Sequence, residues 1–144
     1  MAVKITELSD DWVLAKISWA TTTSTTVEKD VVAGPCTLYF AHVNPTTDAD
    51  EGDGVEDVHL KFWDHANPTH GTDEPEEVLL LKTYDAGSSN FYVTDTPLPI
   101  NPPNGIEFET GLSVAISDST GPGKTAGAGL ASAIDLTLLI KKGS

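Results

Sequence analysis

Short segments in which apolar and polar residues alternate recur along the whole chain. The clearest are 12–19 (WVLAKISW) and 58–63 (VHLKFW), where nearly every second residue is apolar. Side chains of an extended strand point alternately to its two faces, so a period of two predicts half-buried β-strands. Further segments of this kind, or short apolar runs bounded by turn residues, are 27–32, 36–43, 78–84, 90–94, 106–117 and 134–141.

In three of these segments the pattern also predicts which residues face the core, where the strand lies in the sheet, or where it is irregular. In 58–63 the apolar residues are expected to face the core, and His59 and Lys61 the solvent. The segment 36–43 is apolar on both faces, which predicts a central strand. Gly111 separates two alternating halves of a longer segment and predicts a bulge there.

Residues that end strands fill the intervals between these segments. We expect loops at 46–57, 65–77 and 118–132, which are rich in Gly, Asp, Pro or Thr. Four prolines fall within 97–104, and proline lacks the N–H that a sheet ladder needs, so this part is expected to be an edge strand or a crossover. No stretch shows the spacing of a helix.

The sequence therefore predicts an all-β fold of eight to nine strands, an antiparallel β-sandwich of jelly-roll type. A length of 144 residues suits one domain and is enough for a hydrophobic core without disulfides or metals. We expect 13–144 to form that single domain and 1–12 to be an N-terminal arm.

The balance of acidic and basic residues limits the classes of partner that the protein can bind. The chain has 22 acidic and 8 basic residues, a net charge of −14. Such a surface repels nucleic acid and anionic membranes, because both are bound mainly through Lys and Arg. No segment reaches about 18 consecutive apolar residues, and the first ten residues lack the pattern of a signal peptide. We therefore expect a protein made in the cytoplasm that binds neither nucleic acid nor membrane.

Motifs of nucleotide binding and nucleophilic catalysis are incomplete. The segment 121–125 (GPGKT) resembles the end of a phosphate-binding loop, but that motif needs a glycine where this chain has Asp118. There is no G-x-S-x-G motif. The single cysteine, Cys36, begins an apolar run and is expected to be a buried thiol. The sequence thus predicts no catalytic residue, no bound cofactor and no enzyme activity.

Two clusters have metal-binding residue types without metal-binding spacing. Six acidic side chains gather in the loop 46–57, but they lack the spacing of an EF-hand, and whether they hold a cation stays open. His59, His65 and His70 are close in sequence, yet no H-E-x-x-H or paired-cysteine motif accompanies them. We expect solvated side chains and no metal site.

The second half of the chain has a recognisable order of motifs. Residues 57–75 (DVHLKFWDHANPTHGTDEP) give a strand and a G-T-D-x-P loop, residues 98–117 read LPINPPNGIEFETGLSVAIS, and 134–141 close the chain as a strand. This order resembles small β-rich virion proteins of tailed bacteriophages, including head decoration (cement) proteins. In that group a G-I-x-F-x-T-G-L segment leads into the penultimate strand, and a variable Gly/Ala/Thr-rich loop precedes the last one. The resemblance covers more than half of the chain.

The resemblance implies a structural protein that binds the outer surface of a phage head and ties major capsid subunits together, often as a homotrimer. Aromatic side chains dominate the energetics of protein interfaces. The candidate anchors are Trp12, Trp19, Trp63, Phe91 and Tyr92. The alternative is a ligand-binding β-sandwich, such as a carbohydrate-binding or receptor-binding module, with Trp63, Tyr84 and Tyr92 as an aromatic platform.

Overall fold

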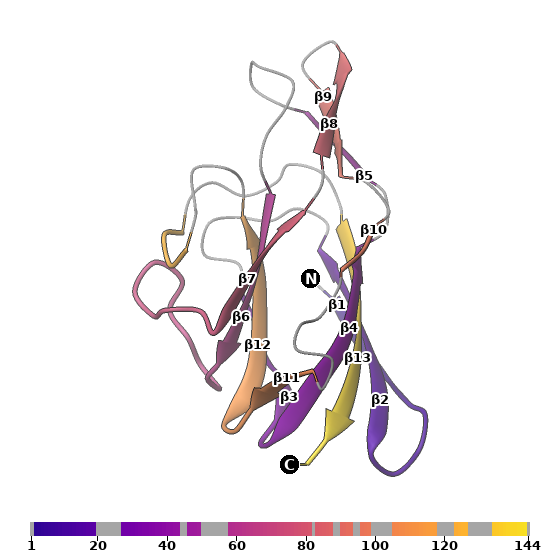
Figure 1. Cartoon of the computed structure of the whole chain (residues 1–144), viewed down its shortest axis with the longest axis vertical. Coiled ribbons are helices and arrows are strands. Elements are labelled where there is room, and N and C mark those ends of the chain that lie inside the picture. Colours follow the sequence, from indigo (N-terminus) through magenta and orange to yellow (C-terminus); the bar gives the residue numbers. More distant parts are fainter. Residues whose placement is uncertain are drawn as a thin grey trace.

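The computed structural model describes residues 2–19, 27–43, 46–49, 58–81, 83–87, 90–93, 96–98, 105–117, 123–126 and 134–143. Every regular element in these residues is a β-strand, and neighbouring strands pair antiparallel (Figure 1). The strands are β1 (Ala2–Glu7), β2 (Trp12–Trp19), β3 (Val27–Ala33), β4 (Cys36–Val43), β5 (Thr46–Ala49), β6 (Val58–Asp64), β7 (Glu77–Leu81), β8 (Thr83–Gly87), β9 (Asn90–Val93), β10 (Thr96–Leu98), β11 (Ile106–Phe108), β12 (Gly111–Ser117) and β13 (Ile134–Lys142).

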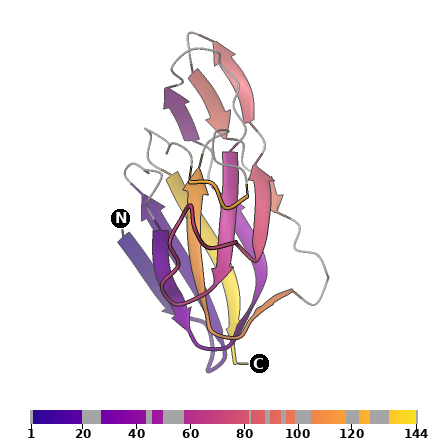
Figure 2. The same cartoon turned by 90° about the vertical axis from the view of Figure 1, so that its left-hand side faces the viewer.

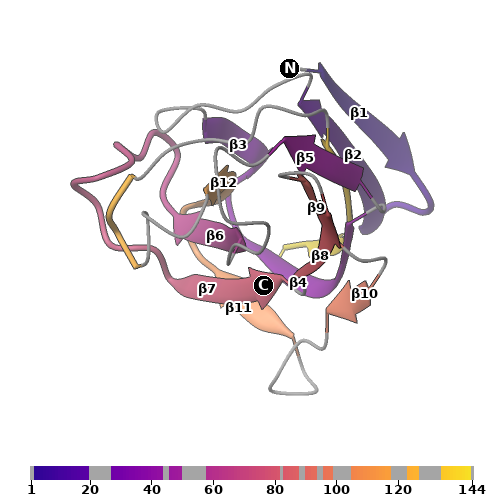
Figure 3. The same cartoon turned by 90° about the horizontal axis from the view of Figure 1, so that it is seen from above.

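These strands form three sheets. Sheet A has the order β1-β2-β13-β4-β10, and β11 also pairs with β4. Sheet B has the order β3-β12-β6-β7. Viewed along the long axis, the two sheets lie opposite each other (Figure 3). A small sheet of β5, β9 and β8 lies at one end of the molecule, at the top of Figure 1.

The chain crosses repeatedly between the two large sheets. Strands β2 and β4 lie in sheet A and β3 and β6 in sheet B; later, β11 and β13 lie in sheet A and β12 in sheet B. The predicted antiparallel β-sandwich is confirmed. The jelly-roll type stays a prediction. It requires two sheets built from Greek keys, and the alternation of strands is compatible with it.

The core lies between the inner faces of the two sheets, and in the described part of the chain it is formed by a cluster of buried hydrophobic residues. It follows the predicted alternation, because every second residue of β2, β6, β12 and β13 points inward. The buried cluster consists of Val13, Ala15, Ile17, Val32, Cys36, Leu38, Ala41, Val43, Val58, Leu60, Phe62, Leu81, Phe108, Leu112, Val114, Ile116, Leu136, Leu138 and Ile140. Strand β4 is central in sheet A, as expected from its apolar composition.

The remaining segments agree with expectation only in part. The predicted arm 1–12 contains β1, which pairs with β2 from Ala2 to Glu7. The predicted loop 46–57 begins with β5, whose backbone pairs with β9, and the rest of that loop lies outside the described residues. Of the proline-rich part 97–104, residues 97 and 98 belong to β10 at the edge of sheet A, as expected of a segment that lacks N–H donors, and 99–104 lie outside the described residues. The segment 106–117 is divided between the sheets, with β11 in sheet A and β12 in sheet B.

The bulge expected at Gly111 is not found there: Gly111 pairs in register with Ala33, and the nearby irregularity has its extra residues, 29–31, in β3. The register of β12 against β3 shifts at Ser113, opposite Asp30, which has a φ of 54°. The Ser113 hydroxyl accepts the N–H of Asp30 at 3.0 Å and donates to the carbonyl of His65 at 2.6 Å. A Cβ at Gly111 would lie 2.6 Å from Oδ1 of Asp30, an exposed side chain that would have to move aside.

Asp64, the last residue of β6, holds the corner between β11 and β12. Its Oδ1 accepts the N–H groups of Thr110 at 2.7 Å and Gly111 at 3.2 Å. Burial alone would raise the pKa of Asp64, but hydrogen bonds from the backbone N–H groups of Glu109, Thr110 and Gly111 lower it below its ordinary value. The folded protein therefore favours the ionised form of this carboxylate.

We predict that Asp64→Asn destabilises the fold by about 1 kcal/mol at neutral pH, because a neutral acceptor makes weaker hydrogen bonds than a carboxylate. With the folded pKa of Asp64 lowered, its stabilisation is fully present above the unfolded pKa of about 4 and is lost as pH falls through the folded value. Urea titrations between acid and neutral pH measure both effects. Asp10→Asn, at an exposed turn, is the control. An Asp64→Asn protein that keeps the pH dependence of the original contradicts the assignment.

Candidate binding surface

The outward-facing side of sheet A carries apolar and aromatic residues in neighbouring positions. Thr6 is opposite Leu14, Leu14 is opposite Leu139, and Leu139 is opposite Phe40, so these residues form one row across β1, β2, β13 and β4. Phe40 is 37% exposed, and Leu14 and Leu139 are half-buried. This row is an apolar strip that water reaches, on a sheet face opposite the core.

An aromatic pair lies beside the strip, on the side of Lys141. The rings of Trp12 and Tyr39 have centroids 5.1 Å apart, at an angle of 44°, and both side chains are half-buried. The Nζ of Lys141 lies 6.0 Å from the centre of the Trp12 ring, within the range of a cation–π contact. Phe40 stacks on His42 with centroids 6.3 Å apart. These contacts hold flat rings in fixed positions on the surface.

Lysines lie in the rows on both sides of the strip. On one side Lys4 is opposite Lys16, and on the other Lys141 is opposite Trp12. All three lysines are exposed. We call this surface, made of Trp12, Leu14, Tyr39, Phe40 and Leu139 with Lys4, Lys16 and Lys141, the open face of sheet A.

The five predicted anchors have different positions. Trp12 lies on the open face, whereas Trp63 is 1% exposed and so offers no surface to a partner. Trp19 ends β2, and Phe91 and Tyr92 belong to β9 in the small sheet, but their side chains lie outside what the structure describes. Sequence reasoning missed Tyr39 and Phe40, because their segment is apolar on both faces and reads as core. The aromatic platform of the alternative ligand-binding module also cannot include Trp63, because this side chain is buried.

The outer face of sheet B, in contrast, is covered around Trp63 and Lys61, although Leu80 at its β7 edge is 58% exposed. Figure 2 shows the loop 65–76 passing in front of this sheet. Trp63 donates its Nε1–H to the carbonyl of Asp73 at 2.9 Å and packs edge-on against the His70 ring, with centroids 5.2 Å apart. Lys61 is 0% exposed; its Nζ donates to the carbonyl of Thr125 at 2.6 Å and lies 3.0 Å from Nε2 of His70. The expectation of a solvated Lys61 is therefore wrong, because two loops close over it.

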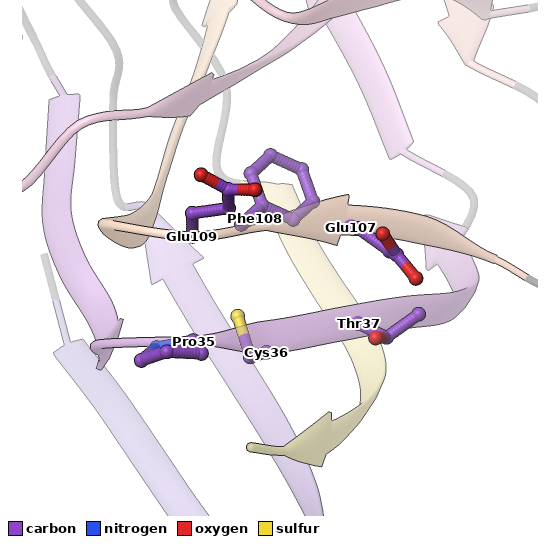
Figure 4. Close-up of a pocket in the computed structure, with 6 residues that line it drawn as sticks. All are labelled: Pro35, Cys36, Thr37, Glu107, Phe108 and Glu109. Carbon is purple, nitrogen blue, oxygen red and sulfur yellow. The ribbon is translucent and has the colours of Figure 1, made fainter. Parts of the chain in front are cut away.

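A small cleft lies beside Cys36, where β11 pairs with the beginning of β4 (Figure 4). It measures about 270 Å³ and is lined by Pro35, Cys36, Thr37, Glu107, Phe108 and Glu109. Burial raises the pKa of the Cys36 thiol to about 12, and the negative charges of Asp64 and Asp30 act in the same direction. Since only a thiolate is a strong nucleophile, this thiol is unreactive at neutral pH. The predicted buried thiol is confirmed.

The remaining predicted clusters do not assemble in the described part of the chain. His59 is half-buried on β6, His65 is exposed, and His70 is buried beside Lys61. Lys124, of the phosphate-loop-like segment, forms an ion pair with Glu74 at 3.4 Å. Within the described ranges, no group of three or more His, Cys, Asp or Glu side chains is placed to hold a metal ion. The acidic side chains of 46–57 fall outside those ranges. Nor do the described residues include a helix long and apolar enough to cross a membrane.

Comparison with protein-family models, with curated proteins and with solved structures finds no significant match to the chain. Its function is therefore argued from its own residues, and the open face of sheet A is the feature with the most definite chemistry.

Proposed function

We propose that this protein is a structural assembly protein that acts by binding and catalyses no reaction. More specifically, we propose a decoration protein that binds the outer surface of a phage head and stabilises contacts between major capsid subunits, as a trimer. The open face of sheet A carries this proposal, because a row of apolar and aromatic side chains that are exposed or half-buried is suited to protein contact.

Two further features support it. The order of motifs from residue 57 onward resembles that of head decoration proteins. The net charge of −14 suits the outer surface of a shell, because an acidic protein facing packaged DNA would be repelled by its phosphates.

Capsids of the phage that encodes the chain, assembled without this protein, provide the test. We expect added protein to bind them and to raise their melting temperature in calorimetry, since a ligand of the assembled state stabilises it. Phe40→Ser, on the open face, should weaken binding at least about tenfold. Leu80→Ser removes an equally apolar side chain that is 58% exposed on β7 in sheet B, and it should bind like the original. Capsids that bind no protein and melt unchanged would exclude the proposal.

A further inference from the structure

The sign of charge on the open face of sheet A is opposite to that of the whole molecule. The chain has 22 acidic residues and only 8 basic ones, all lysines, yet three of those lysines lie on this one face. Lys4 and Lys16 are adjacent across β1 and β2, on one side of the apolar strip. Lys141 is on the other side, over the ring of Trp12. Cations therefore border the strip on both sides.

Two carboxylates lie on the same side of the sheet, one beyond Lys16 and one at the β11 end of the row that contains Lys141. Asp135 is opposite Ser18, two residues beyond Lys16 along β2. Glu107 is opposite Thr37 on the outermost strand, β11. The fourth lysine of this region, Lys142, forms an ion pair with Glu7 at 3.2 Å. The two rows beside the strip thus contain three lysines and one carboxylate, Glu107, which is on the outermost strand.

We propose that the open face of sheet A binds a protein surface that carries Asp and Glu side chains around an apolar centre. This inference rests on the proposed function, because it names the chemistry of the surface to which the protein docks. Burying the strip removes water from the bordering lysines, and that loss is offset only if carboxylates of the partner take the place of the water. A partner with neutral or basic residues at those positions would be rejected.

An acidic protein patch fits this face better than the other anionic partners do. Nucleic acids and anionic membranes present long arrays of negative charge. These arrays repel a molecule of net charge −14 as a whole. A few carboxylates on a protein act mainly within about 8 Å at physiological ionic strength, where they meet the three lysines and not the distant acids of this chain. The apolar strip also requires apolar partner atoms, which a phosphate backbone lacks.

The first test uses the isotope-labelled protein and a peptide that alternates leucine and glutamate. We expect NMR shift changes at Trp12, Leu14, Phe40 and Leu139, and none with a peptide in which lysine replaces glutamate. This arm requires no capsid. Shift changes elsewhere, or equal changes with both peptides, would overturn the inference.

The second test measures binding to capsids at about 50 mM and about 500 mM NaCl, where the Debye length falls from about 14 Å to about 4 Å. Lys16→Glu and Lys141→Glu should each weaken binding by about fivefold to tenfold at low salt, and less at high salt. Lys124→Glu makes the same change of net charge on an exposed lysine of the loop over sheet B, so it should bind like the original.

The outcomes separate the two proposals. Absence of capsid binding by the original protein rejects the proposed function, while the peptide arm still decides the chemistry of the face. Capsid binding that is unaffected by salt and equal in the three variants rejects the acidic partner. Binding to duplex DNA or to phosphatidylserine vesicles that Lys16→Glu abolishes would assign the face to a different class of partner. Self-association in ultracentrifugation that Lys16→Glu abolishes would assign it to a second copy of this chain.

Discussion

Replacing Trp63 with alanine will lower the free energy of unfolding by about 3–5 kcal/mol, the usual effect of truncating a buried tryptophan. The indole is 1% exposed and fills the space between sheet B and the loop 65–76. The substitution removes its packing against His70 and leaves the carbonyl of Asp73 without the indole N–H. Equilibrium denaturation in urea measures the loss.

Two matched variants separate the effect of burial from the effect of the lost hydrogen bond. Trp12→Ala removes the same side chain from the open face, where it is half-buried, and should cost clearly less stability. Trp63→Phe keeps most of the packing and removes the N–H donor, so it should lose about 1–2 kcal/mol. If Trp12→Ala and Trp63→Ala lower the free energy of unfolding equally, the assignment of Trp63 to a covered face and of Trp12 to an open face is contradicted.

Replacing Lys61 with alanine will destabilise the protein by about 3 kcal/mol and will loosen the loops over sheet B. The substitution removes the stem of a fully buried side chain and the donor to the carbonyl of Thr125, and it takes a partner from His70. Losing a charged donor to a buried acceptor costs about 1.5–3 kcal/mol, and losing the packing of the stem adds to this.

Hydrogen exchange locates this effect. We expect amides of 65–76 and 123–126 to exchange faster in Lys61→Ala, because Lys61 joins both segments to the sheet, while the amides of β12 lose protection only as far as global stability falls. Lys61→Met keeps the stem without the amine and should recover part of the stability. Lys16→Ala, at an exposed lysine on sheet A, should change stability by less than about 0.5 kcal/mol. Unchanged loop exchange in Lys61→Ala would contradict the role of Lys61.

The alternation of residues along the chain was a reliable guide to strands and to their inner faces. The apolar positions of 12–19 and 58–63 point into the core where their side chains are described, apart from Trp12, Leu14 and Trp63. Pro97 gave a correct expectation of an edge strand, whereas the bulge expected at Gly111 has its extra residues in the neighbouring strand β3. These signals are local, since each depends on the covalent geometry of one or two residues.

The same pattern could not show what lies over the outer faces. Lys61 and Lys16 both occupy polar positions of alternating strands, yet one is fully buried and the other exposed. The difference comes from the loop 65–76 and from residues 123–126, which lie over sheet B and not over the open face of sheet A. Trp63 and Trp12 differ for the same reason, and so only one of them is available as an anchor.

The sequence by itself determined that this is an antiparallel β-sandwich, which residues of the alternating strands face the core, and that the molecule is strongly acidic. Those properties follow from the period of two and from a count of charges. Only the tertiary structure decided which polar face is open and which is covered, and that Leu14, Leu139 and Phe40 form one row bordered by lysines. These residues come from three strands far apart in the sequence, and only the register of strand pairing brings them together.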